Sequence, residues 1–517
     1  MRNQGIGPWP ARRARKTPKR VAIVHEDQQW TYEELHERVL RLAHALRALG
    51  IRKGDRVAYL GPNHPTFLET LFAAGALGAV FVPLNTRLAA PELAHQVTDS
   101  GSTVLIHAAE LTDVASAADP SSTVRRIALA EPIDNALDYE TLLAAEHTAR
   151  LDEPVSPDDP CMIMYTSGTT GRAKGAVLTH ANITWNSVNV LIDVDLAADE
   201  VTLVTAPLFH TAGLNMTCLP TLLKGGRVVL LGAFDPDRVL DLIAAHHVTY
   251  MFGVPTMYDA MAASPRWASA DLSSLRTLNC GGAPVPERTI AAYLARGLAF
   301  GQGYGMTEAS PGILYLDREQ TTAKAGSAGV PHFFTDIRVV LPDGSDAAPG
   351  EKGEILVSGP HVMTGYWGLP GPTADAFTTD GQWLRSGDIA RLDEDGYAYV
   401  VDRVKDMFIS GGENVYPAEV EGAILQHPAV AECAVVGVPD ATWGEVGRAV
   451  VVLTPGTHAD EAAILAHLHG RLAKYKVPKS VVFAENLPRT ASGKLVKPVI
   501  RTTYAPTTPP ARRDLQS

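Results

Sequence analysis

Short apolar runs alternate with amphipathic helical patterns along most of this chain. In one unit, an apolar run at residues 56–62 precedes a helical pattern at 65–78 and a second apolar run at 79–85. Parallel strands need a crossover between them, usually a helix, so the alternation predicts βαβ units and mainly parallel sheets from about residue 20 to residue 400. Further strands are predicted at residues 201–207, 227–234, 249–255, 275–284 and 298–305, with helices at 235–248, 256–263 and 286–297.

The pattern changes twice toward the C-terminus. Residues 330–400 are rich in turn signals such as "PDGS" and "DEDG", which predicts a local antiparallel sheet. After Asp402 a new α+β unit of about 110 residues begins, a normal domain size. Its predicted helices are 417–428 and 459–475, and its predicted strands are 432–439, 448–455 and 480–488.

These patterns predict two domains. Residues 1–402 form a large α/β domain, with two βαβ-type sheet subdomains and a small antiparallel β subdomain. Residues 403–517 form a small, mobile α+β domain. A chain of 517 residues agrees with this division, because single cores stop growing near ~250–300 residues.

The charge balance argues against some functions. The net charge of −12 disfavours a general nucleic-acid or membrane-surface binder, since both need a basic face. No run of ~18 apolar residues is present, so no integral membrane segment is expected. The basic stretch at residues 11–20 is interpreted as a solvated arm, with a transient phosphate or membrane contact as the alternative.

The 4 cysteines are scattered without metal-ligand spacing. Each lies in or beside an apolar run, and we interpret them as inert core thiols. A reducing cytoplasm fits this usage.

A loop that can bind phosphate follows the apolar run at residues 161–164. It reads "YTSGTTGRAKG" and spans residues 165–175. Glycine lets backbone N–H groups face a ligand, and successive N–H groups form a concavity suited to anions. The spacing is not that of a Walker loop, because two residues separate the glycines and a glycine follows the lysine. The predicted phosphate-binding residues are Thr166, Ser167, Gly168, Thr169, Thr170, Gly171 and Lys174.

This loop resembles the phosphate loop of the AMP-forming adenylating superfamily, which includes acyl-CoA synthetases, luciferases and peptide-synthetase adenylation domains. The resemblance covers roughly residues 20–500, and further motifs stand in the order that the family has. These are "GYGMTE" (residues 303–308), "RSGD" (385–388), "DRVKD" (402–406), "GGENVYPAEVE" (411–421) and "PRTASGK" (488–494).

The resemblance implies a reaction in two steps that uses ATP, Mg²⁺ and coenzyme A. A carboxylate attacks the α-phosphate of ATP to give an acyl-adenylate and pyrophosphate, and a thiol then displaces AMP. Two unit charges ~4 Å apart repel by about 4 kcal/mol at an effective dielectric of ~20. The site therefore needs cations and N–H donors aimed at the developing charge.

The resemblance also implies the catalytic residues. Lys494 is expected to contact both the acyl carboxylate and the phosphate, a task that suits a compact ammonium on a long stem. Lys497, three residues on, is interpreted as a surface lysine. His210, in "PLFHTAGLN", is interpreted as a gate or a neighbour of the carboxylate; an ordinary core histidine is the alternative.

Metal and phosphate contacts are assigned around the "GYGMTE" motif. Glu308, with Thr166, is expected to bind Mg²⁺, which takes one or two carboxylates together with substrate oxygens. Thr307 would hydrogen-bond the α-phosphate.

The adenosine contacts follow from the same resemblance. Tyr304 would stack on adenine, and Asp388 would accept hydrogen bonds from the ribose hydroxyls, with Arg403 in support. The remaining residues assigned to the nucleotide are Gly281, Gly282, Ala283, Pro284, Gly303, Gly305 and Met306.

The second step is expected to need a rotation of the small domain. Lys405 matches the hinge position of the family, and Gly411 and Gly412 would flank the pantetheine path. Trp443 is expected to contact the nucleotide part of coenzyme A. The basic run of Lys474, Lys476 and Lys479 could join it or form a solvated charged face.

The windows expected to line the acyl pocket are residues 206–222, 249–261 and 303–315, and none contains Lys or Arg. A dicarboxylate such as malonate would leave a second charge without a partner, so a monocarboxylate with an apolar or aromatic body is expected. The apolar residues that fit are Met216, Phe252, Met257, Tyr258, Met306 and Ile313.

Other segments, such as "MRNQGIG" and "GVPHFFTD", are similar to those of actinobacterial feruloyl-CoA synthetases. This implies a hydroxycinnamate such as ferulate as the acid. Medium- or long-chain fatty acids remain the alternative, because fatty acyl-CoA ligases share the motifs.

Three other classes of protein fit the sequence less well than a CoA ligase. An amino-acid adenylating module usually has an aspartate near the position of His210, where this chain reads "FHTAG", and no carrier domain follows Lys494. A luciferase-like oxygenase shares the motifs. A binding protein without catalytic activity would be expected to lack Lys494, Glu308 or Asp388. All three residues are present, which disfavours this class. The partners expected are small molecules, and a monomer and a homodimer are both open.

Overall fold

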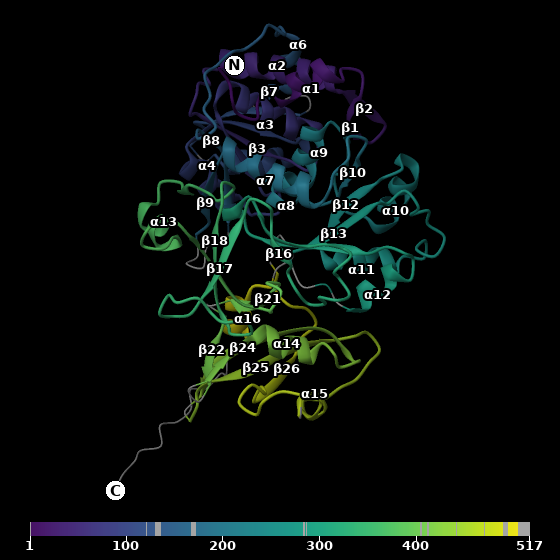
Figure 1. Cartoon of the computed structure of the whole chain (residues 1–517). Helices are drawn as coiled ribbons and strands as arrows, with labels where there is room; N and C mark the ends of the chain where they lie inside the picture. Colours follow the sequence, from purple (N-terminus) through teal and green to yellow (C-terminus); the bar gives the residue numbers. More distant parts are fainter. Residues whose placement is uncertain are drawn as a thin grey trace. The chain divides into compact units, whose positions relative to one another are not determined.

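A computed structural model of the protein describes residues 2–119, 121–129, 136–166, 172–282, 285, 287–403, 406–410, 413–440, 442–469, 471–489 and 495–504. The chain folds into two compact units (Figure 1). The first runs to Ile337 and resumes at Val357–Leu384, and the second takes Arg338–Leu356 and the chain from Arg385 onward. In the described part of the chain, no helix is both long and apolar enough to cross a membrane.

A sheet with 9 described strands forms the centre of one half of the first unit. Its middle is parallel, as the alternating pattern predicts, and antiparallel strands close both edges. In spatial order the strands are β16 (Val330–Pro331), β15 (Gly312–Leu316), β14 (Phe300–Gly305), β13 (Thr277–Gly281), β12 (Tyr250–Gly253), β10 (Val201–Val204), β11 (Arg227–Leu230), β1 (Val21–His25) and β2 (Gln28–Thr31).

The other half of the first unit contains a sheet with 8 described strands. Here the strand that ends at the phosphate loop, β8, pairs with the strand that begins after the loop, β9, in an antiparallel hairpin. The spatial order is β19 (Gly365–Tyr366), β9 (Lys174–Thr179), β8 (Pro160–Thr166), β4 (Val80–Leu84), β3 (Arg56–Leu60), β5 (Ser102–His107), β6 (Arg125–Ala128) and β7 (Leu137–Asp138).

Helices cover these sheets. Helix α3 is mostly apolar and almost wholly buried, as expected of a helix enclosed by protein rather than facing water. It packs on α2, whose N-terminus is closed by a capping box between Thr31 and Glu34. The helices are α1 (Trp9–Lys16), α2 (Tyr32–Ala48), α3 (Pro65–Leu77), α4 (Ala90–Ser100), α5 (Thr112–Ala117), α6 (Tyr139–Ala144), α7 (His180–Asp193), α8 (Thr211–Gly213), α9 (Leu219–Lys224), α10 (Pro236–His246), α11 (Pro255–Ala263), α12 (Glu287–Leu294) and α13 (Pro370–Ala376).

The second unit combines two small sheets with three described helices. The predicted antiparallel sheet is present and has the order β17 (Asp336–Val340), β18 (Gly353–Ser358), β20 (Leu384–Leu392) and β21 (Ala398–Arg403). The C-terminal sheet consists of β23 (Glu413–Val415), β22 (Phe408–Ser410), β25 (Gly444–Leu453), β24 (Val430–Asp440) and β26 (Ser480–Phe483). Its helices are α14 (Pro417–Ile424), α15 (Glu461–Leu468) and α16 (Lys497–Thr503).

The compact units divide the chain elsewhere than at the predicted boundary. Strand β20, from Arg385 onward, and strand β21 belong to the second unit. Yet β20 lies wholly before residue 402, and most of β21 does as well. The boundary of a compact unit marks where contacts between parts of the chain are few. The boundary predicted at residue 402 marks where one domain is expected to rotate relative to the other. The hinge near Lys405 therefore stays a prediction, and Lys405 lies outside the described residues.

Two predictions about local structure are wrong. The long helix predicted at residues 459–475 is short, because α15 ends at Leu468 and the next residue, His469, has an extended backbone. The basic stretch at residues 11–20 is not a solvated arm. Arg13 donates to the carbonyl of Leu223, and Arg20 donates to those of Ala198 and Gly225 at 2.9 and 3.0 Å.

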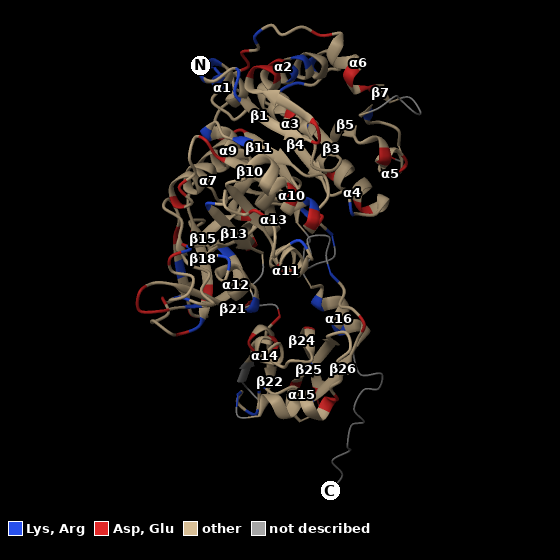
Figure 2. Ribbon diagram, turned by 90° about the vertical axis from the view of Figure 1, so that its right-hand side faces the viewer, with Lys and Arg blue, Asp and Glu red and all other residues tan. Residues whose placement is uncertain are grey.

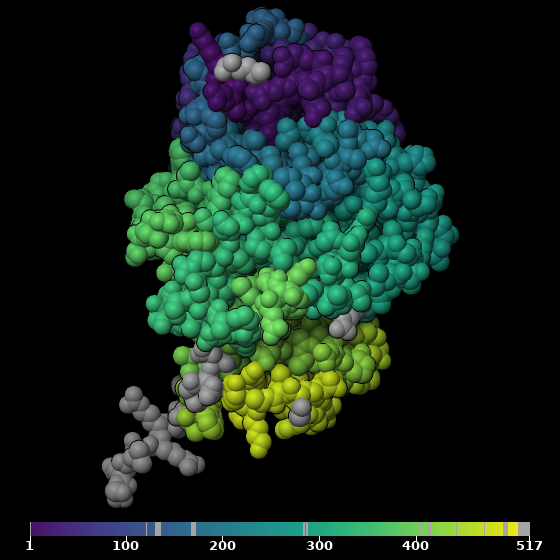
Figure 3. Space-filling view, viewed as in Figure 1, coloured from purple at the N-terminus to yellow at the C-terminus, as the bar shows by residue number. Residues whose placement is uncertain are grey.

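The N-terminal segment is therefore attached to the body of the first unit. Figure 2 shows the stretches of ribbon that belong to Lys and Arg residues (blue) on and beside α1. Figure 3 shows the N-terminal surface (purple) directly beside the surface of later residues (blue). Ion pairs join these parts of the chain: Arg38 pairs with Glu140 at 2.6 Å, and Arg47 pairs with Glu153.

Candidate active site

The residues assigned to the metal lie together at the start of the phosphate loop. Thr166 is the last residue of β8, and Glu308 lies in the 3₁₀ turn Thr307–Ala309 directly after β14. The Thr166 hydroxyl donates to Oε1 of Glu308 at 3.4 Å, although 142 residues separate them. Glu308 is only 7% exposed, so its carboxylate is largely buried and does not lie on the open surface.

A tyrosine that the sequence analysis missed completes this cluster. Tyr366, on the edge strand β19, donates its hydroxyl to Oε1 of Glu308 at 2.9 Å. Its ring also faces Lys174, whose Nζ lies 5.1 Å from the ring centroid, a cation–π distance. Burial and the adjacent Glu308 raise the pKa of Tyr366, so it stays a hydroxyl donor near neutral pH. The signal was the aromatic pair in "TGYWG", but spacing alone did not connect it to the loop.

The donor set fits a magnesium ion. Among the described residues, both hydrogen bonds to the Glu308 carboxylate reach Oε1, which leaves Oε2 for a cation. Mg²⁺ commonly takes one or two carboxylates and completes its shell with water and phosphate oxygens. Within the described ranges no group of three or more His, Cys, Asp and Glu side chains forms a ready-made metal site.

The predicted adenine contacts lie on two neighbouring parallel strands. Gly281 ends β13, and it stands in register with Gly303 of β14. Tyr304 is partly exposed and so is not enclosed in the core. Gly305 must be glycine, because a Cβ there would lie 1.7 Å from the carbonyl oxygen of Pro311. The carboxyl ends of parallel strands are the usual place for ligands in such sheets.

His210 lies where a loop enters a distorted helix. It is the residue before α8, and its ring packs edge-on against Phe209 with centroids 4.8 Å apart. The helix continues as a π-helical turn, Leu214–Cys218, before α9. Such turns are rare and often occur at functional sites. Asn63 supports the loop before His210: it donates to the carbonyl of Ala206 and accepts from the N–H of Leu208.

Most of the predicted acyl-pocket residues are nearly buried, and one prediction there is wrong. Met216 and Phe252 are 6% and 7% exposed, Ile313 is fully buried, and Met257 and Met306 are half-buried. Tyr258 packs into the core instead: it is fully buried, and its hydroxyl donates to the carbonyl of Asn279 at 2.8 Å.

In the second unit, the two residues assigned to the ribose are paired. Asp388 on β20 stands opposite Arg403 on β21, and the guanidinium Nε lies 3.0 Å from the carboxylate Oδ1. The backbone N–H of Asp388 donates to the Ser386 hydroxyl at 3.0 Å. Trp443 is 49% exposed and so presents a large aromatic surface to solvent.

The structure contradicts the interpretation of Lys497. Lys497 is not a surface lysine: its side chain is 12% exposed, and its Nζ lies 2.9 Å from Oε1 of Glu421. Lys476 pairs with Glu419 at 2.5 Å. The predictions for Ser167, Gly168, Thr169, Thr170, Gly171, Ala283, Pro284, Lys405, Gly411, Gly412 and Lys494 lie outside the described residues.

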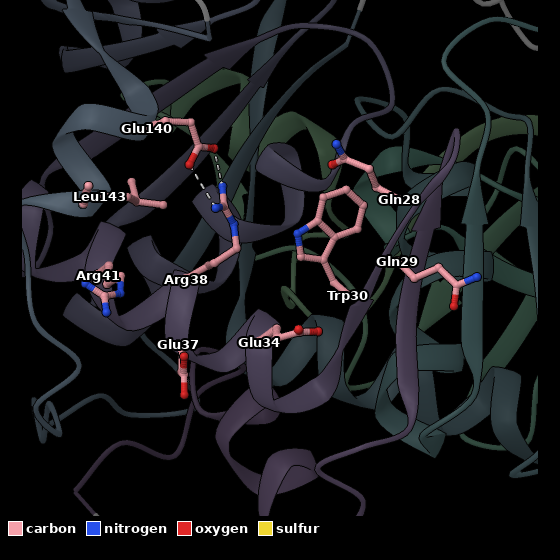
Figure 4. Close-up of a pocket in the computed structure, with 10 residues that line it drawn as sticks. Gln28, Gln29, Trp30, Glu34, Glu37, Arg38, Arg41, Glu140 and Leu143 are labelled. Atoms are coloured by element: carbon pink, nitrogen blue, oxygen red, sulfur yellow. Dashed lines mark hydrogen bonds and ion pairs between the residues drawn. The ribbon is translucent and has the colours of Figure 1, made fainter.

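One surface hollow lies away from all of these residues. It has a volume of about 520 Å³ and lies between β2, α2 and α6 (Figure 4). Its guanidinium groups are already engaged. Arg38 binds Glu69 and Glu140, and Arg41 donates to the carbonyl of Glu146. Paired charges of this kind hold α2 and α6 together and offer little to a ligand.

Comparison with known proteins decides the family. The profile of the AMP-binding enzyme family matches residues 10–367, and that of the AMP-binding enzyme C-terminal domain matches residues 419–494. The chain belongs to the AMP-binding enzyme family. The predicted fold class is confirmed, because this AMP-binding enzyme aligns over its whole fold with solved structures. One is ATP-bound MatB from Rhodopseudomonas palustris, with a TM-score of 0.88 and 35% identity over 96% of this chain and 99% of that one.

The AMP-binding enzyme is also similar in sequence to two curated relatives over nearly its full length. A feruloyl-CoA synthase from Amycolatopsis sp is 59% identical over 97% of this chain and 99% of its own. A long-chain-fatty-acid–CoA ligase from Mycobacterium tuberculosis is 40% identical over 98% of this chain and 100% of its own.

Proposed function

We propose that the protein is an ATP-dependent carboxylate–CoA ligase that forms an acyl-adenylate and then an acyl-CoA thioester, releasing pyrophosphate and AMP. One observation carries the reaction class: Thr166, Lys174 and Glu308 come together where the phosphate loop joins its strands. We propose a hydroxycinnamate such as ferulate as the acid, which the 59% identity to a feruloyl-CoA synthase supports. Fatty acids are the second candidate, supported by the 40% identity to a fatty-acid–CoA ligase.

In the first step, the enzyme must offset the repulsion between the carboxylate and the triphosphate. Thr166 and Glu308 would hold Mg²⁺, which supplies positive charge to the phosphate oxygens when it is bound. Lys174 would bind the phosphates from the other side of the hairpin. Thr307 would donate to the α-phosphate, and Lys494 would bridge it and the attacking carboxylate, so that charge is stabilised where it develops.

The nucleoside would be held by groups that are ordered in advance. Tyr304 would stack on adenine. Asp388 can accept hydrogen bonds from both ribose hydroxyls, because an ionised carboxylate is an acceptor with two oxygens. Its ion pair with Arg403, at 3.0 Å, keeps that carboxylate oriented.

In the second step, a thiol replaces AMP. We propose that the chain bends at Lys405, that Gly411 and Gly412 leave room for the pantetheine arm, and that Trp443 contacts the nucleotide part of coenzyme A. Hinges are a few residues at element boundaries that absorb the change in φ and ψ. Lys476 already has Glu419 as its partner, so we propose no coenzyme A contact for this residue.

The acid would occupy a pocket without a fixed cation. Met216, Phe252, Met257 and Met306 offer apolar surface for an aromatic ring, and His210 would stand beside the carboxylate. A second carboxylate would be desolvated there without a partner, so dicarboxylates should be excluded. We also propose a cytoplasmic location, which the four free, buried cysteines support.

A panel of acids tests the proposal. Purified protein is incubated with ATP, Mg²⁺, coenzyme A and ferulate, 4-coumarate, benzoate, octanoate, palmitate or malonate, and pyrophosphate, AMP and thioester are measured. We expect ferulate to give the highest kcat/KM and malonate none. Release of ADP, or no pyrophosphate with any acid, would overturn the reaction class. Highest kcat/KM with octanoate or palmitate would overturn the choice of acid alone.

A further inference from the structure

Three ionisable side chains meet in the interior of the second unit. The ammonium of Lys497 lies 2.9 Å from Oε1 of Glu421, and the two side chains are 12% and 14% exposed. Asp402 is 6% exposed, and the charge of Lys497 acts on it directly. Burial raises the pKa of both carboxyls, and Lys497 opposes that rise in each case.

The three residues come from parts of the chain that are far apart in sequence. Asp402 is next to last in β21, three residues before the predicted hinge residue Lys405. Glu421 lies on α14. Lys497 is the first residue of α16 and follows the predicted catalytic lysine, Lys494, by three residues.

Helix α14 is the common anchor of this triad. Asp402 accepts a hydrogen bond from the N–H of Ala418 in the first turn of α14, at 2.7 Å. Glu421 accepts another from the N–H of Val435 on β24, also at 2.7 Å. The triad therefore brings together the end of β21, helix α14, strand β24 and the start of α16.

The residues just before position 490 contact the residues just after position 494. Arg489 and Leu495 form an isolated antiparallel bridge, and the N–H of Val496 donates to the carbonyl of Pro488 at 3.0 Å. The ion pair of Lys497 lies directly after these contacts, so it fixes the chain that follows residue 494 to α14.

Stability alone does not account for such a triad. Taking charges out of water costs several kcal/mol per ion, and well-packed apolar residues of similar size are often equally stable or more so. Charged, hydrogen-bonded groups do fix the relative orientation of the elements that carry them, because their partners must lie within a narrow range of distances and angles. Such a fixed orientation is expected where a reacting group must be placed to within a fraction of an ångström.

We propose that Lys497 is a positioning residue for the adenylation step. With its partner Glu421, it fixes the chain that follows Lys494 to α14, so that these two parts of the small domain rotate together about the predicted hinge. This inference rests on the proposed function, in which Lys494 serves adenylate formation.

The experiment compares Lys497→Met, which keeps the chain length without the charge, with Lys497→Arg, which keeps the charge. Adenylate formation is measured in a single turnover with ATP and the acid that the wild-type enzyme prefers. Thioester formation is measured separately from that acyl-adenylate, supplied ready-made, and coenzyme A. Ile464→Val, a core substitution on α15 away from the triad, is the matched control for lost stability.

We expect Lys497→Met to slow adenylate formation through kcat by between about 10- and 100-fold, with KM for ATP within about twofold of wild type. Thioester formation should change by less than about threefold, and Lys497→Arg should recover most of the lost rate. Equal slowing of both half-reactions, or the same slowing in Ile464→Val, would overturn the positioning role. If Lys497→Met does not fold, Glu421→Gln removes the charge from the other partner while it can still accept from Val435, and the same outcomes apply. Wild-type activity tests the proposed function, whereas the ratio of variant to wild type tests this inference.

Discussion

At the scale of the residue, the site depends on one carboxylate and the groups that orient it. Glu308 receives hydrogen bonds from Thr166 and Tyr366 on the same oxygen, and Lys174 rests on the ring of that tyrosine. Groups that orient a metal ligand commonly change metal affinity or activity by about 10–100-fold when they are removed. Tyr366 is therefore expected to matter although it need not touch ATP.

Tyr366→Phe should raise the Mg²⁺ concentration needed for half-maximal pyrophosphate release by about 10-fold. The ring stays beside Lys174, but the hydrogen bond to Glu308 is lost. Tyr32→Phe is the control, because it removes a buried hydroxyl that donates to the carbonyl of Gly226, a contact outside the predicted site. A magnesium dependence that matches wild type would show that Tyr366 does not orient the ligand.

Lys494→Ala should lower adenylate formation by at least about 100-fold, because it removes a cation from the point where charge develops. Thiol transfer from a supplied acyl-adenylate should be largely retained. Lys19→Ala, which removes an exposed lysine with a side chain that is 84% accessible, should leave both rates unchanged. An equal loss in both half-reactions would contradict a role confined to the first step.

At the scale of the element, the ends of strands place the functional groups. Strand β8 delivers Thr166 to the phosphate loop, and β14 leads directly into the turn that carries Glu308. The β20–β21 pairing sets Asp388 opposite Arg403. Strand β21 then ends at Arg403, two residues before the position at which we predict the hinge.

Lys405→Pro should allow adenylate formation and block thioester formation. Proline fixes φ near −65° and so prevents the rotation that the second step is proposed to need. The readout is AMP and thioester release after adenylate has formed in a single turnover. Lys405→Ala, which keeps φ free, is the control and should make thioester at a rate within about threefold of wild type. Normal turnover of the proline variant would remove the hinge assignment.

At the scale of the whole molecule, buried histidines link stability to pH. Burial lowers the pKa of His180 to about 4 and that of His361 to about 3. Between about pH 6.5 and these values the unfolded chain takes up protons that the folded chain does not, so stability falls as the pH falls through this window. His180 also accepts a hydrogen bond from the N–H of Ile6 on Nδ1, at 3.2 Å, which protonation of that nitrogen would break.

The free energy of unfolding, measured in urea, should therefore decrease from pH 6.5 to pH 5 by about 2 kcal/mol for each of these histidines. His180→Gln should flatten this dependence, because it removes one such group. His458→Gln, at an exposed position, is the control and should leave the slope as in wild type. Equal slopes in all three proteins would show that His180 does not contribute.

Much of the architecture could be predicted from local pattern. The alternation of strands and helices predicted the parallel sheets, because apolar periodicity reflects burial that each element must satisfy wherever it packs. The motifs predicted Thr166 and Glu308 as ligands of one metal ion and placed Asp388 and Arg403 at the nucleotide, and the structure then shows each two side by side. The long helix after residue 459 was a mistake of the same method: its composition suits a helix, but the fold ends it at Leu468.

What the sequence by itself determined is the class of elements and the chemistry available at each motif, since both depend on residues close together in the chain. Only the tertiary structure decided which distant groups meet. Tyr366 reaches Glu308 because β19 pairs with β9 at the sheet edge, and Lys497 is buried because α16 begins beside α14. Tyr258 turns into the core for the same kind of reason: its direction is set by packing against residues more than twenty positions away. No local pattern contains that information, because burial and pairing are properties of the folded chain.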